Sequence, residues 1–234
     1  MYLVEKNINK FYQDRYTLFL NPKELQDVSS HLRKNSYFIY KPYEDAEKCI
    51  LYQNEIPLIT LFEINSPIKL SHSDILGTLF SLRIDEHLFG DIIIWNNHYY
   101  FYTFDYMKTY FEMELKKIKN ANITLIQKDI HILSEYKPNF QEITIINSSL
   151  RIDSIIAKII HTNRDTVKDL IKDKKITYNY ELLTSSNKNI SINDTFSIRR
   201  FGKYKFIEIE GNTKKNNLIL KIHKYIENNN SKEL

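Results

Sequence analysis

Residues 150–180 read LRIDSIIAKIIHTNRDTVKDLIKDKKITYNY, two short helical patterns that run directly into a strand. The first pattern has isoleucines at positions i, i+3, i+4 and i+7, the spacing of one helix face: Ile152, Ile155, Ile156 and Ile159. The second has a narrower apolar stripe, formed by Val167, Leu170 and Ile171. The segment therefore predicts an apolar helix beside a charged helix, both leading into a sheet.

Downstream of this segment the pattern changes to strands. Residues 195–211 and 217–226 are rich in aromatic and β-branched residues and are joined by a polar loop, which predicts antiparallel pairing. Residues 148–226 hold 16 Lys and Arg against 8 Asp and Glu, whereas residues 1–147 hold 16 against 19. Positive charge is thus concentrated in the last third of a chain whose net charge is only +4, as expected of a module that binds a polyanion.

The charged helix carries cations at every fourth position, at Arg164, Lys168 and Lys172. This spacing aligns three positive groups about 6 Å apart, close to the spacing of successive phosphates on a nucleic-acid strand. Lys174 and Lys175 extend the row beyond the helix. The same helix has aspartates that pair with lysines at i,i+3 on a solvated face: Asp165, Asp169 and Asp173. Periodicity alone leaves both interpretations open.

A second cationic cluster favours the nucleic-acid interpretation. It lies in RRFGKY, residues 199–204, and combines three cations with an aromatic residue: Arg199, Arg200, Lys203 and Tyr204. Cations interleaved with an aromatic ring suit phosphate pairing together with base stacking.

Two segments precede this basic region. Up to about residue 70 the patterns predict two helices, over 7–20 and 21–35, the second capped by Asn21. Two strands follow, over 37–40 and 49–64. The next segment predicts a helix over 73–84 and a hairpin over 90–104 that turns at Asn96-Asn97. Another helix over 105–118 and a strand over 122–127 follow. This second order is typical of a ferredoxin-like, RRM-like sandwich.

The 234 residues are therefore predicted to form an α+β protein of three domains. Residues 1–70 form an N-terminal α/β domain, and residues 71–146 form the ferredoxin-like, RRM-like domain. Residues 147–234 form a C-terminal domain that holds the two helices and the basic sheet. Segments of about 75 residues bury only about 60% of the surface that their unfolded chains expose, which makes them marginally stable alone. We therefore expect the domains to pack against one another.

The C-terminal domain resembles the S-four-type RNA-binding domain, whose α-L fold is named after a small-subunit ribosomal protein. The resemblance rests on five short matches: Arg151-Ile152-Asp153, Asn163-Arg164, Leu170-Ile171, the strand 176–179 and the turn and strand 193–199 with Asp194 and Arg199. The sequence departs from the family pattern where Asn163 stands for Ser, and where Lys174 and Asn193 stand for Gly. Asn tolerates a positive φ, so the turn at Asn193 is expected to survive.

Three further stretches extend the resemblance over nearly the whole chain, to the YlmH family of bacterial RNA-binding proteins: FLNPKEL at 19–25, YEDAEKCI at 43–50 and LSHSDILGTLFSLRIDEHLFGDIII at 70–94. The resemblance implies two domains ahead of the S-four-type domain, the middle one with an RNA-recognition fold. It also implies a partner, rRNA or tRNA on the large ribosomal subunit, and a role with stalled subunits that carry a nascent chain and tRNA. A link to cell division is also implied.

On this basis the C-terminal domain is expected to grip structured RNA. Arg151 and Arg164 would contact phosphates near the joint of the two helices. The groove and its far side would be formed by the remaining candidates: Lys168, Lys172, Lys174, Lys175, Asn179, Arg199, Arg200, Lys203 and Tyr204. We expect neither a metal nor a cofactor, and we expect the protein to act as a monomer.

An RNA-modifying enzyme that uses the C-terminal domain for targeting is the main rival interpretation, and a ribosome or cell-division scaffold is a third. With only four glycines the chain has no GxGxxG or P-loop, and it has no HExxH or CxxC pattern, which counts against an enzyme. The adjacent His72-Ser73-Asp74 is better explained by a helix cap at Ser71 or Ser73, since catalytic triads form through space. Asp85 and Asp91 are candidate acids, with a turn role as the alternative for Asp91.

Three aromatic residues of the hairpin, Tyr99, Phe101 and Tyr102, are candidates for an RNA stacking platform, although alternation along a strand favours core packing. Cys49 lies in an apolar strand and is expected in the core, and a single cysteine allows neither an internal disulfide nor a Cys-based zinc site. No stretch reaches the roughly 18 apolar residues of a membrane span, and the start MYLVEKNINK lacks the layout of a secretory signal. We therefore expect a cytoplasmic protein.

Overall fold

The computed structural model describes residues 2–226, and these divide into two compact units. We call residues 2–137 the N-terminal unit and residues 138–226 the C-terminal unit. Both mix helices with strands, so the predicted α+β class is confirmed. The finer division of the first 146 residues into two domains stays a prediction.

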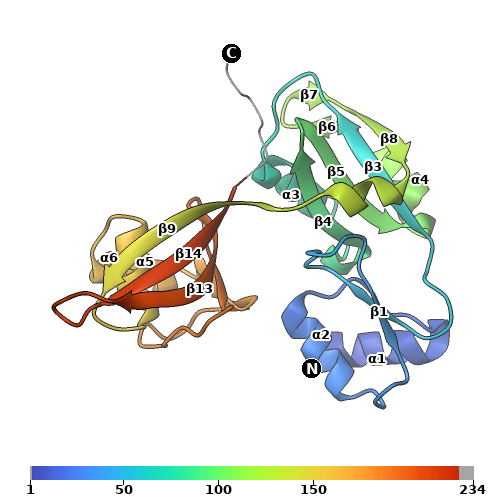
Figure 1. Ribbon diagram of the computed structural model, residues 1–234. Helices are drawn as coiled ribbons and strands as arrows, with labels where there is room; N and C mark the ends of the chain where they lie inside the picture. Colours follow the sequence, from blue (N-terminus) through green and yellow to red (C-terminus); the bar gives the residue numbers. More distant parts are fainter. Residues whose placement is uncertain (1, 227–234) are drawn as a thin grey trace. The chain divides into compact units, whose positions relative to one another are not determined.

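The N-terminal unit is built on a four-stranded antiparallel sheet in the order β4-β5-β3-β8 (Figure 1). Its strands and connecting helices are β3 (Ile59–Asn65), α3 (His72–Ser81), β4 (Phe89–Trp95), β5 (His98–Phe104), α4 (Lys108–Glu114) and β8 (Thr124–Lys128). This chain order, β-α-β-β-α-β, is that of a ferredoxin-like fold. The strand β3 pairs with both β5 and β8, although the sequence pattern assigns it to the segment before residue 71.

Shorter elements complete this unit. The N-terminal segment contains α1 (Tyr2–Asp14), α2 (Pro22–Ser30), β1 (Phe38–Tyr40) and β2 (Ile50–Tyr52). Three 3-10 helices and a small hairpin occur later: η1 (Glu86–Leu88), η2 (Asp105–Met107), η3 (Ile130–Glu135), β6 (Lys117–Ile118) and β7 (Ala121–Asn122). The helix expected over 105–118 is therefore shorter, because it starts as η2 and ends before β6.

Local sequence signals account for where several of these elements begin and turn. Asn21 and Glu24 exchange hydrogen bonds with each other's backbone in the capping box predicted for α2. Ser71 and Asp74 form the same box at α3, so the stretch around Ser71 is a helix start rather than a triad. The Asn96-Asn97 pair has φ values of 51° and 64°, the type I′ geometry of a two-residue hairpin turn.

Both faces of the central strands β3 and β5 are buried. On one face, α3 and α4 pack over a cluster that includes Phe62, Tyr99 and Phe101. The other face is covered by residues from the N-terminal segment and from η3, in a second cluster: Leu18, Phe19, Tyr43, Ile50, Leu61, Tyr102, Phe104 and Leu133. Tyr99, Phe101 and Tyr102 are thus core residues, and the hypothesis that they form an exposed stacking platform is wrong.

The C-terminal unit is a six-stranded antiparallel sheet in the order β11-β10-β12-β13-β14-β9. Its elements are β9 (Asn139–Asn147), α5 (Ile152–Ile159), α6 (Arg164–Lys172), β10 (Ile176–Tyr178), β11 (Glu181–Leu182), β12 (Thr195–Ile198), β13 (Gly202–Asn212) and β14 (Leu218–Ile226). Two helices followed by an antiparallel sheet is the order that the sequence predicts. The strand β9 pairs with β14 from Asn139 to Asn147, so it belongs to this sheet although it precedes the boundary expected at residue 147.

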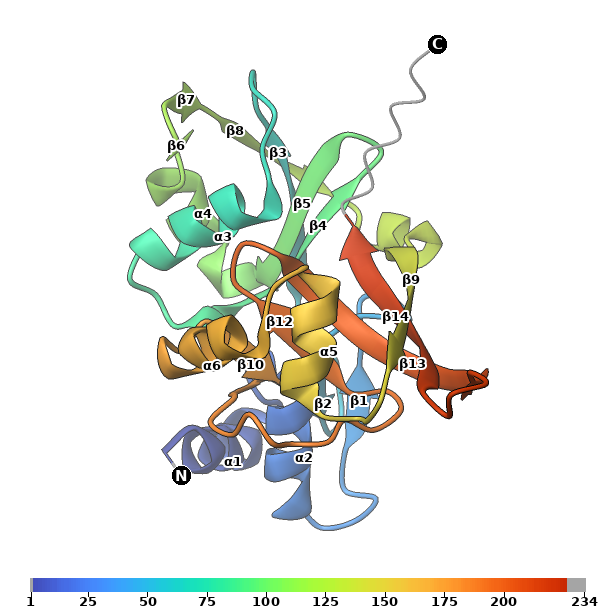
Figure 2. The same ribbon diagram turned by 90° about the vertical axis from the view of Figure 1, so that its left-hand side faces the viewer.

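The apolar faces of α5 and α6 pack on one face of this sheet, where Figures 1 and 2 both show the two helices together. Five residues of the two predicted apolar stripes are buried, namely Ile152, Ile155, Ile156, Val167 and Ile171, while Ile159 and Leu170 are half-buried. They share a cluster with residues of β12, β13 and β14: Phe196, Ile198, Tyr204, Phe206, Leu220 and Ile222. The helices therefore cover one face of the sheet, and the alternate side chains of each strand point to the other face, which we call the outer face.

Candidate nucleic-acid interface

The N-terminal ends of α5 and α6 bring two arginines onto one buried aspartate. Asp153, whose side chain is 0% exposed, lies in the first turn of α5. Arg151 donates from Nε and Nη2 to its two carboxylate oxygens at 3.2 and 2.9 Å. Arg164 donates from Nε and Nη2 to Oδ2 at 3.2 and 2.7 Å. We call Arg151, Asp153 and Arg164 the arginine corner.

The two helix starts explain why these groups meet. Arg151 is the N-cap residue of α5, and Arg164 is the first residue of α6 after its N-cap, Asn163. Burial alone would raise the pKa of Asp153, but the hydrogen bonds from Arg151 and Arg164 outweigh it and lower that pKa below its usual range. The carboxylate is therefore ionised at neutral pH, and two guanidinium charges surround one negative charge.

This arrangement positions the guanidinium groups without hiding them. The side chains of Arg151 and Arg164 remain 35% and 48% exposed. A guanidinium has five N–H donors, and the contacts with Asp153 use only Nε and Nη2 of each arginine. The Nη1 groups can therefore donate to a phosphate while Asp153 fixes the plane of each guanidinium. The Arg-x-Asp spacing at a predicted helix start is a sequence signal for the contact of Asp153 with Arg151, but not for its contact with Arg164.

Two of the predicted lysines pair with aspartates at the surface of the unit. Lys168 Nζ lies 2.8 Å from Asp165, and Lys175 Nζ lies 2.7 Å from Asp173. Both pairs are exposed, and surface ion pairs contribute only ~0–1 kcal/mol, so a phosphate can replace either aspartate at little cost. Lys172 is exposed on the same helix. Without RNA the charged face of α6 is therefore solvated, as the alternative interpretation predicts. Its lysines can still exchange their aspartate partners for phosphates.

Lys174 adopts the left-handed conformation that the S-four-type pattern reserves for Gly, with φ of 56°. Its N–H donates to the carbonyl of Ile171, and the N–H of Lys175 donates to the carbonyl of Leu170, both at 2.9 Å. These are the two bonds of a Schellman motif that closes α6. The loop geometry therefore survives the departure from Gly, at the expense of strain in a residue that has a Cβ.

Replacing this lysine by glycine should separate stability from binding. We expect Lys174→Gly to raise the free energy of unfolding of the C-terminal unit by about 1 kcal/mol, because Gly adopts this φ without strain. The change also removes one cation, so RNA affinity should fall, and its log–log salt slope should become shallower by about 1. Urea unfolding and RNA titrations at several salt concentrations measure the two effects. Lys172→Gln is the control: it should weaken RNA binding in the same way and leave the free energy of unfolding unchanged. A Lys174→Gly protein whose free energy of unfolding is unchanged or lower would contradict the strain at position 174.

Two predicted contact residues are used inside the fold instead. Tyr204 is only 2% exposed and its ring stacks on Phe196 with centroids 5.4 Å apart, so the predicted base-stacking role of Tyr204 is wrong. The reason is strand alternation, which places Tyr204 on the core side of β13 between two outward lysines. Asn179 donates to Asp194 and accepts from the N–H of Thr195, both at 2.8 Å, and these bonds fix the turn after β10.

The remaining candidates divide between the two sides of the sheet. Arg199 and Arg200 are exposed in the turn between β12 and β13, and the N–H of Arg199 donates to the carbonyl of Lys175 at the end of α6. Lys203 alternates with the buried aromatic of β13 and so lies on the outer face, away from α6. Lys203 therefore does not close the expected groove. The exposed aromatic residue of this turn is Phe201, which the sequence pattern does not single out.

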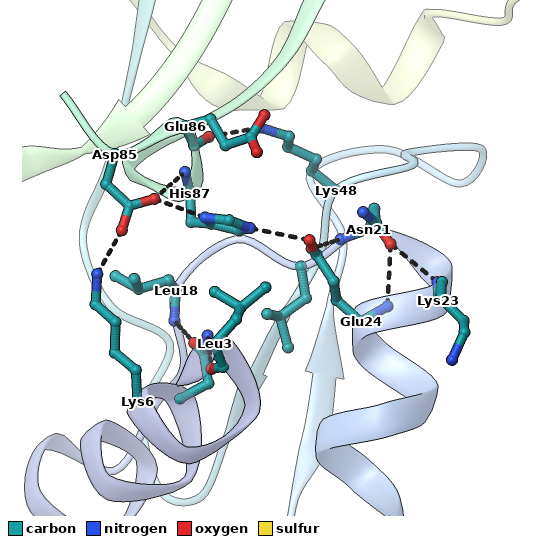
Figure 3. Close-up of polar contacts among 12 residues, drawn as sticks. Leu3, Lys6, Leu18, Asn21, Lys23, Glu24, Lys48, Asp85, Glu86 and His87 are labelled. Atoms are coloured by element: carbon teal, nitrogen blue, oxygen red, sulfur yellow. Dashed lines mark hydrogen bonds and ion pairs between the residues drawn. The ribbon is translucent and has the colours of Figure 1, made fainter. Parts of the chain in front are cut away.

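Asp85, a candidate acid, belongs to a polar chain that fastens α1 and α2 to the start of β4 (Figure 3). Asp85 caps η1, binds Lys6 and lies 2.6 Å from Nδ1 of His87. Nε2 of His87 lies 3.0 Å from Glu24 of α2. Burial lowers the pKa of His87, but its hydrogen bonds to Glu24 and Asp85 outweigh burial and raise it, which favours the protonated ring. These contacts give Asp85 a structural role.

The other candidate acid, Asp91, joins the loop before β2 to the sheet. It accepts hydrogen bonds from the hydroxyl groups of Tyr43 and Tyr102 at 2.8 and 3.0 Å. It also accepts from the backbone N–H groups of Glu47 and Lys48 at 2.9 and 3.1 Å. Burial raises the pKa of Asp91. Its position after Gly90 suggests a turn, whereas it lies within β4 as the centre of a half-buried polar network.

Other features that bear on chemistry are few. Cys49 is buried, as predicted, and burial raises the pKa of its thiol to about 11. Among residues 2–226, no group of three or more His, Cys, Asp or Glu side chains is placed to hold a metal ion. Over the same range, none of the helices is both long and apolar enough to cross a membrane.

Comparison with known proteins finds similarity both in the N-terminal unit and over most of the chain. Residues 55–131, which include β3 to β8, match the family model described as "Putative RNA-binding domain in YlmH". Over 222 residues the chain is 24% identical to "Ribosome-associated protein quality control protein P2" of Bacillus subtilis (strain 168), with 89% of this chain and 86% of that protein covered. A solved structure, "Cell division protein ylmH from Streptococcus pneumoniae", is 19% identical with a TM-score of 0.46 and covers 56% of this chain and 90% of its own.

The matched region coincides with the ferredoxin-like order β3-α3-β4-β5-α4-β8, so the similarity covers the whole four-stranded sheet and the helices α3 and α4. The near end-to-end similarity to the Bacillus protein extends the match to the C-terminal unit. The chain is thus similar to proteins of the YlmH family over most of its length, as the sequence resemblance predicts.

Proposed function

We propose that this protein binds structured RNA on the ribosome in ribosome-associated quality control and has no catalytic activity of its own. The matched RNA-binding domain and the name of the Bacillus relative support an RNA-binding role of this kind. The finer proposal is that the target is rRNA or tRNA on a large subunit that carries a stalled nascent chain. The protein would act there as a cytoplasmic monomer.

The arginine corner is the observation that carries this proposal. Arg151 and Arg164 are oriented by one buried carboxylate before any ligand binds, so little side-chain entropy is lost when they meet a phosphate. From the corner, Lys168 and Lys172 continue along α6 in steps of one helical turn, about 6 Å each. A ribose-phosphate strand lying along α6 would therefore meet successive cations.

Reversing charge on α6 tests this site. Arg164→Glu would set a second carboxylate beside buried Asp153 and disturb the fold, so the test uses Lys168→Glu with Lys172→Glu. We expect this variant to lose co-sedimentation with large ribosomal subunits, with affinity at least about 100-fold lower, while its circular dichroism is unchanged. Lys214→Glu with Lys215→Glu, exposed in the β13–β14 loop, is the matched control with the same change in net charge. An equal loss in both variants would reject the site.

The same assay distinguishes the rival functions. Binding through phosphates should weaken with salt, with a log–log slope of about −0.7 to −0.9 per phosphate contacted. A flat salt response would favour a protein-docking scaffold instead. Multiple turnover of an RNA substrate would favour an RNA-modifying enzyme.

A further inference from the structure

The outer face of the C-terminal sheet carries aromatic rings and cations that the arginine corner and α6 do not use. Tyr204, Phe206 and Ile222 point into the core, so their strand neighbours point to the outer face. We call one connected group on this face the aromatic strip: Phe140, Tyr180, Lys203, Lys205, His223 and Tyr225. It reaches from the turn after β10, across β13 and β14, to the edge strand β9.

Ring contacts join the strip into one surface. Lys203 Nζ lies 4.6 Å from the ring centroid of Tyr180 and 5.4 Å from that of Tyr225. The Phe140 ring meets Tyr225 edge-on at 4.8 Å and stacks on His223 at 5.1 Å. Lys205 is the direct partner of His223 in the pairing of β13 with β14. Rings and cations therefore alternate across neighbouring strands.

Tyr180 is held in a backbone conformation that bulky residues rarely adopt. Asn179 and Tyr180 have φ values of 46° and 69°, and they form the two-residue turn between β10 and β11. The second position of such a type I′ turn normally holds Gly. A tyrosine here strains the backbone and places a ring beside Lys203. Strain retained in a folded protein tends to occur where a side chain serves function.

The outer face also carries acidic side chains. Lys221 lies 3.1 Å from Glu208 and 3.0 Å from Glu210, so acidic side chains balance that part of the face. Within the strip, Lys203 packs against rings, and Lys205 lies two positions along the same strand, about 7 Å away. The carboxylate of Glu142 lies at the border of the strip, 3.9 Å from Nε2 of His223.

We infer that the aromatic strip binds unpaired nucleotides of RNA, as a second contact surface on the other side of the sheet from the arginine corner. Unpaired bases stack on aromatic side chains of open sheets, and lysines beside the rings bind the phosphates. Strands lie about 4.8 Å apart, so the strip has room for about two or three bases. This inference rests on the proposed function only in taking RNA as the ligand, because the two surfaces share no residue.

Two labelled RNAs test the strip by fluorescence anisotropy: a 12-nucleotide oligouridylate and a fully paired hairpin. The variant Phe140→Leu with Tyr225→Leu removes two rings and keeps apolar bulk on the strands, and circular dichroism checks its fold. We expect it to bind the oligouridylate at least about tenfold more weakly and the hairpin within about twofold of wild type. Lys221→Gln, on the acid-balanced part of the same face, is the matched control and should bind both RNAs as wild type does.

The outcomes separate this inference from the proposed function. Oligouridylate binding unchanged in the leucine variant overturns the inference. If the wild type binds the hairpin but no oligouridylate, the inferred role of the aromatic strip is rejected and the RNA-binding role of the arginine corner is retained. If the wild type binds oligouridylate but not the hairpin, the role of the arginine corner is rejected and that of the strip is retained. If the leucine variant loses ribosome co-sedimentation but still binds oligouridylate as the wild type does, the strip docks a protein, and the inference is again overturned.

Discussion

Gly90→Ala is expected to lower the free energy of unfolding of the N-terminal unit by about 3–5 kcal/mol. A Cβ at position 90 would lie 1.7 Å from Cε2 of Tyr102, far inside contact distance. The Tyr102 ring cannot move aside cheaply, because it is fully buried, packs edge-on against Phe19 and donates its hydroxyl to Asp91. Relieving the clash would break this packing and leave the half-buried carboxylate of Asp91 without its hydrogen bond from Tyr102.

Trp95 gives a direct measurement of this effect. It is the one tryptophan of the chain and lies at the end of β4, so its fluorescence during urea unfolding reports on the N-terminal unit. Gly77→Ala is the matched control, since a Cβ there meets nothing within 4 Å and the position lies inside α3. The control should stabilise the unit by up to about 1 kcal/mol. A Gly90→Ala protein with the wild-type midpoint would contradict the close packing described for Tyr102.

The second large effect is expected at the arginine corner. Asp153→Asn removes the charge on which Arg151 and Arg164 converge, and the new amide nitrogen would face an arginine donor. We expect the free energy of unfolding of the C-terminal unit to fall by about 2–3 kcal/mol at pH 7. Binding of the paired RNA hairpin should weaken as well, because the two guanidinium groups lose their orientation. Circular dichroism during urea unfolding and hairpin titration measure the two effects.

The pH dependence of this variant has a definite sign. Because the arginines lower the pKa of Asp153 in the folded protein, the stability it contributes is present above its unfolded pKa, about 3.9, and is lost as the pH falls through the lower folded value. The stability difference between wild type and Asp153→Asn should be constant from pH 5 to 8 and should shrink below about pH 4. Asp165→Asn, which removes an exposed carboxylate on α6, should leave the free energy of unfolding unchanged at every pH. A difference that grows on acidification would contradict the ion pairs.

Features encoded by neighbouring residues could be predicted from the sequence. The capping box at Asn21, a helix cap at Ser71 or Ser73, and the hairpin turn at Asn96-Asn97 each depend on two to four consecutive residues. The structure has the box and the turn, and it places the cap at Ser71. The apolar faces of α5 and α6 follow from periodicity alone. The candidate lysines of α6 were likewise visible as a four-residue repeat, although their role stays a prediction.

Features that depend on distant pairing could not be predicted in this way. The strand β3 reads as part of the first segment, and only its pairing with β5 and β8 places it in the ferredoxin-like sheet. Tyr204 looked like a ligand-stacking residue because it stands among cations, yet alternation with Lys203 and Lys205 already assigned it to the opposite face. The convergence of both arginines on Asp153 requires two helix starts to meet in space, which no local pattern encodes.

The double cover over β3 and β5 limits how the N-terminal unit can meet RNA. In a four-stranded RNA-recognition fold, bases lie flat on the open side of the sheet. In this protein, residues from the first fifty positions and from η3 cover that face of the sheet, and α3 and α4 cover the opposite face. The surfaces of this unit that stay accessible are its turns, the outer sides of its helices and the two edge strands of the sheet, β4 and β8. Such surfaces suit recognition of the shape of a folded RNA rather than recognition of its individual bases.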